Sequence, residues 1–144
     1  MKIIVKKIFV NGYGSIGSRI AKFIKDDPDI TITGIGKHSS NEKVQHAIDA
    51  GFSVFVPEEK IDSFKNYDIS GTIESILDDC DLVIEASPEG NGFLNKKNMY
   101  EPKGVKAIFQ GGETVFNDKA VADILFNSRA VSYTHLTLPT ILLV

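Results

Sequence analysis

Residues 8–17 of the chain read Ile8-Phe9-Val10-Asn11-Gly12-Tyr13-Gly14-Ser15-Ile16-Gly17. An apolar run leads into a Gly-x-Gly-x-x-Gly motif, and a helical pattern follows it. A nucleotide pyrophosphate binds to backbone N–H groups at a helix N-terminus where no side chain intervenes. The glycines then serve the tight turn, the approach of the backbone to the phosphates, and the close packing of helix on strand. The motif predicts a dinucleotide site, with a plain turn as the alternative.

Strands and helices alternate along the chain. We expect strands at about residues 7–11, 30–36, 52–56, 81–86 and 105–109. We expect helices over about 16–24, 42–50 and 91–100, the last ending before Pro102, and a short one over 72–78. In the first helix one apolar face is expected to hold Ile16, Ile20, Phe23 and Ile24. Residues 58–70 are expected at the surface. The alternation predicts an α/β fold with a doubly wound parallel sheet, a Rossmann-type dinucleotide-binding domain.

Composition limits the classes of function. The chain has 144 residues, 42% of them hydrophobic, which suits one domain with a buried core. A net charge of −3, with both signs well mixed, does not indicate a nucleic-acid or membrane surface. No segment is long and apolar enough to suggest a membrane span. The single cysteine, Cys80, excludes an intrachain disulfide and fits a reducing, cytoplasmic compartment. No Cys/His spacing suggests a metal site.

The loop after the second expected strand bears on cofactor choice. A free ribose 2′-hydroxyl favours an acidic residue here, but residues 30–41 contain no Asp or Glu. They contain Lys37 and His38 instead, followed by two serines. Because an ammonium group attracts a 2′-phosphate, the loop predicts that NADP is accepted, alongside or in preference to NAD. The alternative is that Lys37 is an ordinary solvent-exposed lysine.

Two further loops follow buried strands at the edge of the sheet where ligands bind. Ser87 and Pro88 come after the fourth strand, and Gln110 and Gly111 come after the fifth. Small residues there permit a close approach of backbone to a ligand. A simple turn explains each loop equally well.

The remaining polar candidates suggest structural roles. Cys80 stands among Asp78, Asp79 and Asp81, whose carboxylates disfavour a reactive thiolate. It also precedes its strand, so we expect it at the edge opposite the ligand. His46 falls in a helical pattern and is expected at or near the surface. His38 is expected near the adenosine end of a cofactor, without a visible acid/base partner.

The last fourteen residues differ from the rest of the chain. Residues 131–144 contain no Asp, Glu, Lys or Arg, whereas the whole chain is 24% charged. The stretch Val131 to Thr140 resembles a translated sequencing adapter, so we exclude residues 131–144, with Tyr133 and His135, from the functional interpretation. We expect residues 1–130 to form an incomplete NAD(P)-binding domain. A buried strand with an apolar tail is the alternative.

Four blocks together resemble archaeal-type glyceraldehyde-3-phosphate dehydrogenases over about residues 7–130. The blocks are Val10-Asn11-Gly12-Tyr13-Gly14-Ser15-Ile16-Gly17 with Arg19, Gly34-Ile35-Gly36-Lys37, Glu85-Ala86-Ser87-Pro88, and Lys106-Ala107-Ile108-Phe109-Gln110-Gly111-Gly112-Glu113. The resemblance implies a cytoplasmic homotetramer of glycolysis. Such an enzyme oxidises glyceraldehyde 3-phosphate with phosphate and NAD(P), giving 1,3-bisphosphoglycerate.

The resemblance also implies which residues contact the cofactor. By position these are Gly12, Gly14, Ser15, Ile16, Gly17, Lys37, Ser87, Pro88, Gln110 and Gly111. Lys37 matches the family's lysine near the 2′-phosphate. His38 stands where many members carry threonine, which bears on the preference for NADP.

The family's catalytic cysteine lies in a Ser-Cys-Asn-Thr-Thr block that does not occur in this sequence. The resemblance therefore implies an N-terminal fragment without catalytic residues, inactive by itself. Two alternatives stay open. One is another oxidoreductase, related to homoserine dehydrogenase or dihydrodipicolinate reductase, against which the Gln110–Glu113 block argues. The other is a non-enzymatic nucleotide-sensing domain.

Overall fold

A computed structural model describes residues 6–88, 91–110 and 130–132 of the chain. Its strands are β1 (Lys6–Asn11), β2 (Ile30–Gly36), β3 (Val54–Val56), β4 (Gly71–Thr72), β5 (Leu82–Glu85), β6 (Lys106–Phe109) and β7 (Ala130–Ser132). Its α-helices are α1 (Ser15–Ile24), α2 (Glu42–Asp49), α3 (Ile73–Ile76), α4 (Asn91–Asn95) and α5 (Glu101–Lys103). Two 3₁₀ turns, η1 (Glu58–Phe64) and η2 (Leu77–Asp79), and one π-helical turn, η3 (Lys96–Tyr100), complete it.

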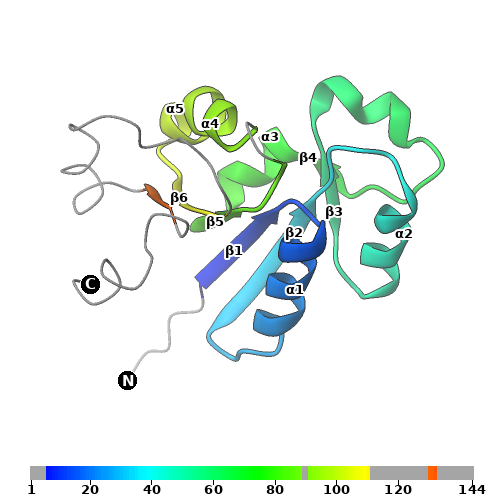
Figure 1. The fold of residues 1–144 in the computed structure, drawn as a ribbon, viewed down its shortest axis with the longest axis horizontal. Coiled ribbons are helices and arrows are strands. Elements are labelled where there is room, and N and C mark those ends of the chain that lie inside the picture. Colours follow the sequence, from blue (N-terminus) through cyan, green and yellow to red (C-terminus); the bar gives the residue numbers. More distant parts are fainter. Residues whose placement is uncertain (1–5, 89–90, 111–129, 133–144) are drawn as a thin grey trace.

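The strands form one sheet in the order β4-β3-β2-β1-β5-β6-β7, and every neighbouring pair is parallel. The strand that leads into the glycine motif therefore lies in the middle of the sheet (Figure 1). Strand order changes direction beside β1, because β2 pairs with one edge of β1 and β5 with the other. The expected doubly wound parallel sheet is confirmed, and this change of direction places a ligand site at the carboxyl ends of β1, β2 and β5.

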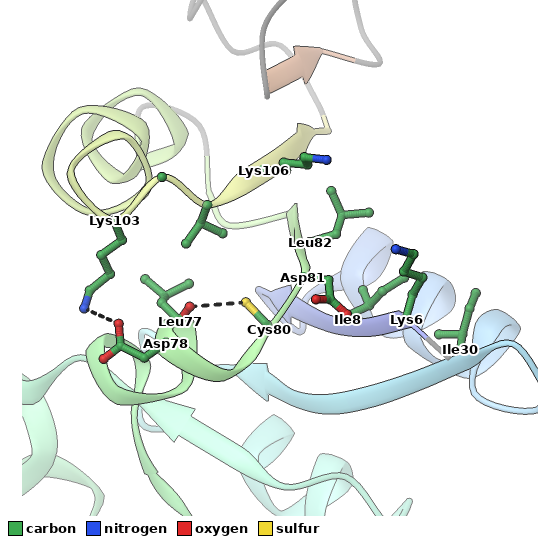
Figure 2. A pocket seen from close by; sticks show the side chains of 12 residues that line it. Lys6, Ile8, Ile30, Leu77, Asp78, Cys80, Asp81, Leu82, Lys103 and Lys106 are labelled. Atoms are coloured by element: carbon green, nitrogen blue, oxygen red, sulfur yellow. Dashed lines mark hydrogen bonds and ion pairs between the residues drawn. The ribbon is translucent and has the colours of Figure 1, made fainter. Parts of the chain in front are cut away.

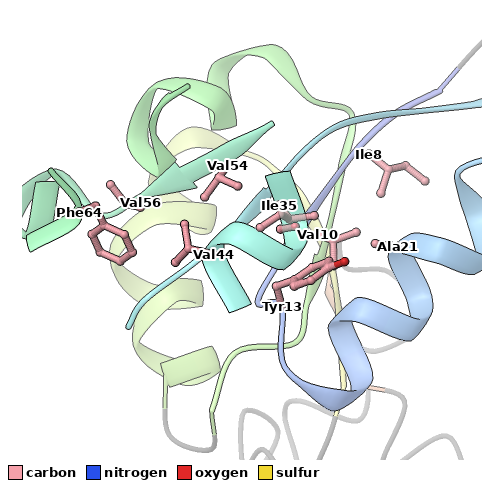
Figure 3. Close-up of a cluster of buried hydrophobic side chains, with 10 residues drawn as sticks. Ile8, Val10, Tyr13, Ala21, Ile35, Val44, Val54, Val56 and Phe64 are labelled. Carbon is pink, nitrogen blue, oxygen red and sulfur yellow. The ribbon is translucent and has the colours of Figure 1, made fainter. Parts of the chain in front are cut away.

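Successive side chains of the strands point to opposite faces and build two separate cores. On one face Ile8 and Val10 of β1 pack with Ile35, Ala21 of α1 and Val44 of α2 (Figure 3). The opposite core contains Phe9, Phe55, Ile73, Leu77, Val83, Tyr100, Ala107 and Phe109. Both faces of the sheet are therefore covered, as a parallel sheet requires.

The apolar face expected for α1 is wrong in part. Phe23 is 87% exposed and Ile16 is 48% exposed, whereas Gly17 and Ala21 are buried. The helix lies so close to the glycine turn that a Cβ atom on Gly17 would overlap the Gly12 carbonyl oxygen. Small residues therefore face the sheet, and the larger side chains at positions 16 and 23 are rotated outward.

The helix expected to stop before Pro102 continues past it. Residues 91–103 run as α4, the π-helical turn η3 and α5, and the chain leaves the helix at Gly104 with a left-handed φ of 65°. Pro102 lies in the first turn of α5, where a missing N–H group is tolerated. The helix expected over residues 72–78 is α3 followed by η2, and the Thr72 hydroxyl caps it by accepting a bond from Ser75 N.

Strand β4 was not expected, and residues 58–70 form a mostly exposed segment anchored by the buried ring of Phe64. Strand β7 takes in Val131 and Ser132, so the backbone of these two residues extends the sheet beside β6. Residues 133–144, and with them Tyr133 and His135, lie outside the described residues.

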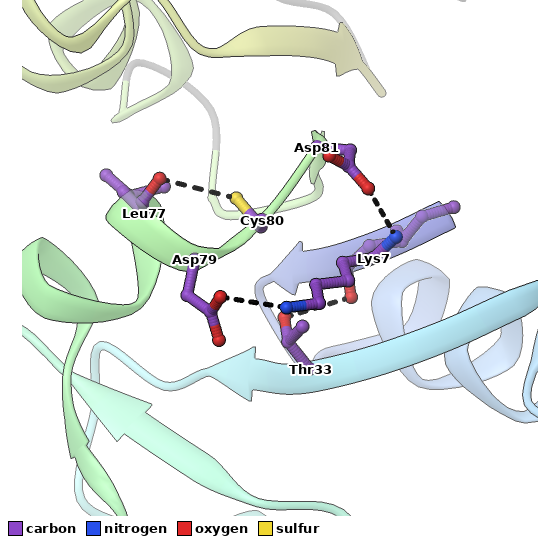
Figure 4. A network of polar contacts seen from close by, with 7 residues as sticks. Lys7, Thr33, Leu77, Asp79, Cys80 and Asp81 are labelled. Carbon is purple, nitrogen blue, oxygen red and sulfur yellow. Dashed lines mark hydrogen bonds and ion pairs between the residues drawn. The ribbon is translucent and has the colours of Figure 1, made fainter. Parts of the chain in front are cut away.

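The amino end of β1 is fixed by polar contacts at the edge away from the glycine motif. Lys7 donates from its backbone N–H to Asp81 Oδ2 at 2.8 Å and from Nζ to Asp79 Oδ1 at 3.0 Å (Figure 4). The register of β1 and β2 shifts between Ile8 and Phe9, and the bulged Thr33 donates from its hydroxyl to Ile8 O. These contacts set the register that brings the carboxyl ends of the strands level.

Candidate functional site

A cavity of about 350 Å³ opens at the carboxyl ends of β1, β2 and β5. Three segments that the sequence singled out line it together. These are the glycine turn (Gly12 to Ile16), the loop after β2 (Gly36 to Ser39) and the loop after β5 (Ala86 to Pro88), joined by Asn41 and Lys43. Seven expected contact residues therefore surround one space: Gly12, Gly14, Ser15, Ile16, Lys37, Ser87 and Pro88.

Two glycines of the motif are required by the fold itself. Gly12 has a φ of +125°, and a Cβ atom there would overlap the carbonyl group of Ala86. Gly17 is held against the Gly12 carbonyl oxygen in the same way. These glycines join the turn after β1 to the loop after β5 and to helix α1, so they explain the shape of the site.

Gly14 differs from its two neighbours in the motif. Its φ is −86°, which any residue adopts, and a Cβ atom there would meet nothing within 4 Å. Neither backbone strain nor packing requires a glycine at this position. Gly14 lines the cavity, and its missing side chain leaves the backbone there open to a ligand.

Helix α1 begins at this point without a side-chain cap. Its N-cap residue is Gly14, no side chain accepts a hydrogen bond there, and the first turn carries no acidic residue. The first N–H groups of a helix have no partner within the helix, and the helix dipole adds positive potential. This end of α1 therefore suits an anion such as a pyrophosphate.

Lys37 lies in the wall of the same cavity and is not the solvent-exposed lysine of the alternative interpretation. The residue as a whole is only 6% exposed, and it lines the cavity. Burial lowers the pKa of Lys37, Lys43 lowers it further, and Glu42 acts in the opposite direction. The amine itself is not among the buried polar atoms that lack a partner, so it opens onto the cavity. A bound anion there would offset the desolvation that disfavours its charge.

The loop after β5 lines the cavity, whereas the described part of the loop after β6 does not. Ser87 is buried and Pro88 exposed, and both line the cavity. Gln110 donates from its backbone N–H to Glu85 O at 2.9 Å and does not line the cavity. Gly111 lies outside the described residues.

A buried polar network beneath the cavity was missed by the sequence interpretation. The carboxylate of Glu85, 1% exposed, receives bonds at Oε2 from the backbone N–H and the hydroxyl of Ser87, at 2.9 and 2.5 Å. At Oε1 it receives bonds from Tyr100 Oη at 2.6 Å and Asn95 Nδ2 at 2.7 Å. The signal available in the sequence was a single acidic residue that closes an otherwise apolar strand, Leu82 to Glu85.

The network continues from Glu85 to the loop after β2. Asn11 Nδ2 donates to Tyr100 Oη at 2.8 Å, and Asn11 Oδ1 lies 2.8 Å from His38 Nε2. His38 therefore has a partner, although that partner is an amide and not an acid. Burial, then the charges of Lys60 and Lys37, lower the pKa of His38 to about 4, so its ring is neutral at neutral pH. Burial beside Glu85 raises the pKa of Tyr100 well above its ordinary value.

A larger cavity, of about 770 Å³, lies at the opposite edge of the sheet. Figure 2 shows Lys6, Ile8 and Leu82 around it, with Cys80 near the ion pair of Lys103 and Asp78. Burial, with Asp81, Asp79 and Asp78, raises the pKa of Cys80 to about 11, and its thiol faces Leu77 O at 3.7 Å. This cavity lies at the amino ends of the strands, away from the glycine motif and the ligand edge of a doubly wound sheet.

In residues 6–88, 91–110 and 130–132, no group of three or more His, Cys, Asp or Glu side chains could hold a metal ion. No helix within the same ranges is long and apolar enough to cross a membrane. His46 is exposed on α2, as expected for a surface histidine.

No protein-family model matches the chain. Individual curated proteins do match it. The chain is 39% identical over 124 residues to a glyceraldehyde-3-phosphate dehydrogenase of Sulfolobus acidocaldarius, covering 85% of this chain and 35% of that protein. It is 40% identical over 124 residues to one from Methanosarcina mazei, covering 85% and 36%. It is 40% identical over 109 residues to one from Methanothermobacter thermautotrophicus, covering 74% and 32%.

These matches confirm the resemblance to archaeal glyceraldehyde-3-phosphate dehydrogenases that the four blocks indicated. The chain spans about a third of the length of the curated relatives it matches.

Solved structures confirm the fold alone, because their sequence identity is low. A scyllo-inositol dehydrogenase from Lactobacillus casei matches with a TM-score of 0.62 at 15% identity, covering 92% of this chain and 37% of that one. An NAD-binding protein from Listeria innocua matches with a TM-score of 0.56 at 15% identity, covering 90% and 33%.

Proposed function

We propose that this chain, which matches archaeal glyceraldehyde-3-phosphate dehydrogenases over most of its own length, is the cofactor-binding part of such an enzyme. Its site takes NADP or NAD at the carboxyl edge of the sheet. The observation that carries the proposal is Gly14, a glycine that neither the backbone nor the packing requires and that borders the cavity. The uncapped start of α1 at the same residue supports a pyrophosphate there.

Each of the ten expected contact residues has a proposed role. Gly12, Gly14, Ser15 and Ile16 form the turn and first helical residues that face the pyrophosphate. Gly17, which does not line the cavity, holds helix α1 against that turn. Ser87 and Pro88 line the opposite wall, and Gln110 and Gly111 follow the next strand. Lys37 binds the 2′-phosphate of NADP, a role supported by its place in the cavity wall, where its amine opens onto the cavity. This arrangement favours NADP over NAD.

Calorimetric titration of the whole chain with NADP and with NAD tests both parts of the proposal. We expect NADP to bind more tightly, and Lys37→Gln to remove that advantage while leaving NAD affinity nearly unchanged. Lys65→Gln, an exposed lysine on the segment after β3, is the matched control and should change neither affinity. A folded chain that binds neither dinucleotide would refute the proposed cofactor site.

A second variant separates ligand binding from folding. Gly14→Ala should lower the melting temperature by a few degrees at most and weaken both dinucleotides by about tenfold or more, because the new methyl group occupies the phosphate approach. If Gly14→Ala binds both cofactors as the unaltered chain does, the pyrophosphate does not lie against this residue.

The longer enzyme is proposed to oxidise glyceraldehyde 3-phosphate with phosphate, giving 1,3-bisphosphoglycerate and NAD(P)H. It is further proposed to be a cytoplasmic homotetramer acting in glycolysis. The present sequence contains one cysteine, Cys80, and the cavity beside it is not the cofactor cavity. We therefore expect the chain to form no NAD(P)H from glyceraldehyde 3-phosphate and phosphate, measured by absorbance. Measurable turnover would contradict the assignment of the chain as a binding part only.

A further inference from the structure

The hydrogen bonds around Glu85 run in one direction. Among the described residues, five groups approach its carboxylate and all are donors: two from Ser87, the hydroxyl of Tyr100, and the amides of Asn95 and Asn11. An ionised carboxylate only accepts hydrogen bonds, so in each of these contacts the proton comes from the partner. Glu85 therefore fixes the direction in which Tyr100 and Asn11 can bond.

This direction is transmitted to His38. Tyr100 uses its proton on Glu85 Oε1 and accepts from Asn11 Nδ2, which turns Asn11 Oδ1 toward the imidazole. An amide oxygen cannot donate, so His38 Nε2 must carry the proton in this contact. The ring is then the neutral Nε2–H tautomer, and Nδ1 keeps its lone pair.

The fold leaves room for this chain of contacts. A Cβ atom on Gly36 would overlap Asn11 Oδ1, so the glycine at the end of β2 makes space for the amide. Tyr100 ends the π-helical turn η3 and is 1% exposed. Wide turns of this kind are unusual within helices and often occur at functional sites.

We propose that Glu85 and Tyr100 are positioning residues for the dinucleotide. One oxygen of Glu85 holds the Ser87 wall of the cofactor cavity, and the other, through Tyr100 and Asn11, holds the His38 wall. The two walls come from loops about 50 residues apart in sequence and line the same cavity. This inference rests on the proposed cofactor site, which it deepens by naming what sets the spacing of its walls.

Tyr100→Phe tests the proposal with little change of volume. The variant removes the hydroxyl that joins Asn11 to Glu85 and leaves Asn11 Nδ2 only its 3.4 Å contact with Glu85. We expect NADP affinity to fall about tenfold, measured by calorimetry at a temperature where circular dichroism shows a folded chain. Tyr67→Phe, a partly buried tyrosine against the other core, is the matched control and should bind as before.

Nuclear magnetic resonance of the histidine ring gives a readout that loss of stability alone would not produce. In the unaltered chain, nitrogen shifts should identify His38 as the Nε2–H tautomer, assigned among the three histidines with a His38→Gln variant. Glu85→Gln keeps the side-chain size. Its amide oxygen is expected to face the Ser87 N–H, so its NH₂ group faces Tyr100 and Asn95. The reversal we expect is that Tyr100 accepts from position 85 and donates to Asn11, whose amide rotates and donates to His38. We expect the Nδ1–H tautomer in that variant.

The outcomes separate this inference from the proposed function. NADP bound by the unaltered chain but weakened in Tyr100→Phe, with the tautomer reversed in Glu85→Gln, supports the proposal. Equal NADP affinity in Tyr100→Phe and the unaltered chain overturns the positioning role and leaves the proposed function standing. An unchanged tautomer in Glu85→Gln also overturns it. If the unaltered chain binds neither dinucleotide, the proposed function fails and this inference fails with it.

Discussion

Gly17 lies directly against the carbonyl oxygen of Gly12, at a distance that leaves no space for a Cβ atom. The contact joins the first turn of α1 to the end of β1, in the middle of the sheet. Gly14, between them in sequence, has open space where its side chain would be. One motif thus contains glycines required by packing and a glycine that packing does not require.

Gly17→Ala should therefore destabilise the chain by about 3 kcal/mol or more. To make room for the new methyl group, the backbone of helix α1 or of the turn at Gly12 must move. Gly14→Ala should cost less than about 1 kcal/mol, the ordinary difference between glycine and alanine at a helix N-cap. Urea denaturation of both variants, monitored by circular dichroism, gives the two values. Similar losses in both variants would contradict the distinction between the two glycines.

Tyr13 carries a buried hydroxyl without a hydrogen-bond partner among the described residues. Its ring packs edge-on against Phe52, with centroids 5.8 Å apart. An unsatisfied buried hydroxyl costs free energy, so Tyr13→Phe should leave stability unchanged or raise it by up to about 1 kcal/mol. The melting temperature of the variant checks this. A clear decrease would indicate that the hydroxyl is satisfied in solution.

His38 gives stability a dependence on pH. Its pKa in the folded chain is about 4, below the ordinary 6.5, because burial and then Lys60 and Lys37 disfavour the charged ring. Between these values the unfolded chain binds a proton that the folded chain does not, so stability falls as the pH falls from 6.5 toward 4. The loss from this group should reach about 2–3 kcal/mol at pH 4.5.

Comparison with His38→Asn isolates this effect from the carboxylates, which also titrate in acid. The unaltered chain should lose more stability than the variant between pH 7 and pH 4.5, as measured by urea denaturation. Equal losses in the two proteins would mean that His38 does not stay neutral on folding.

Cys80 should react slowly despite its partial exposure. Burial, with the nearby Asp81, Asp79 and Asp78, raises the pKa of its thiol to about 11 from 9.0, and only the thiolate is nucleophilic. Iodoacetamide at pH 8 should alkylate the folded chain about 100-fold more slowly than the chain unfolded in guanidinium. Mass spectrometry of the reaction with time measures both rates. Comparable rates in the folded and unfolded chains would show that the fold does not disfavour ionisation of the Cys80 thiol.

The strands were the most predictable part of the fold. Strand β2 has the bounds that were expected, because Ile30 to Gly36 alternates β-branched Ile and Thr and closes with glycine. The glycine turn was equally clear, since its residue types follow from the backbone. The face of α1 could not be predicted from apolar spacing alone. Its orientation depends on the close packing of Gly17 on Gly12, which a hydrophobic pattern does not encode.

The candidate site was predictable where a residue directly follows a strand of the sheet. Gly12, Lys37 and Ser87 each follow a strand, and the topology of a doubly wound sheet brings such positions together. The network of Glu85, Tyr100 and Asn11 was not predictable, because its members lie up to 89 residues apart and meet only through β1, β5 and η3. The helix that carries Tyr100 was expected, but the π-helical turn that ends at it was not.

The central place of β1 has a consequence for the order in which the chain acquires its structure. During synthesis β1 can pair with β2 once residue 36 has emerged, but its other edge waits for β5, with Ile8 beside Leu82. Until then one edge of an apolar strand stays open, and closing the intervening loop costs entropy. We expect the nascent chain to need protection against aggregation over this interval and to resist proteolysis only after β5 has left the ribosome.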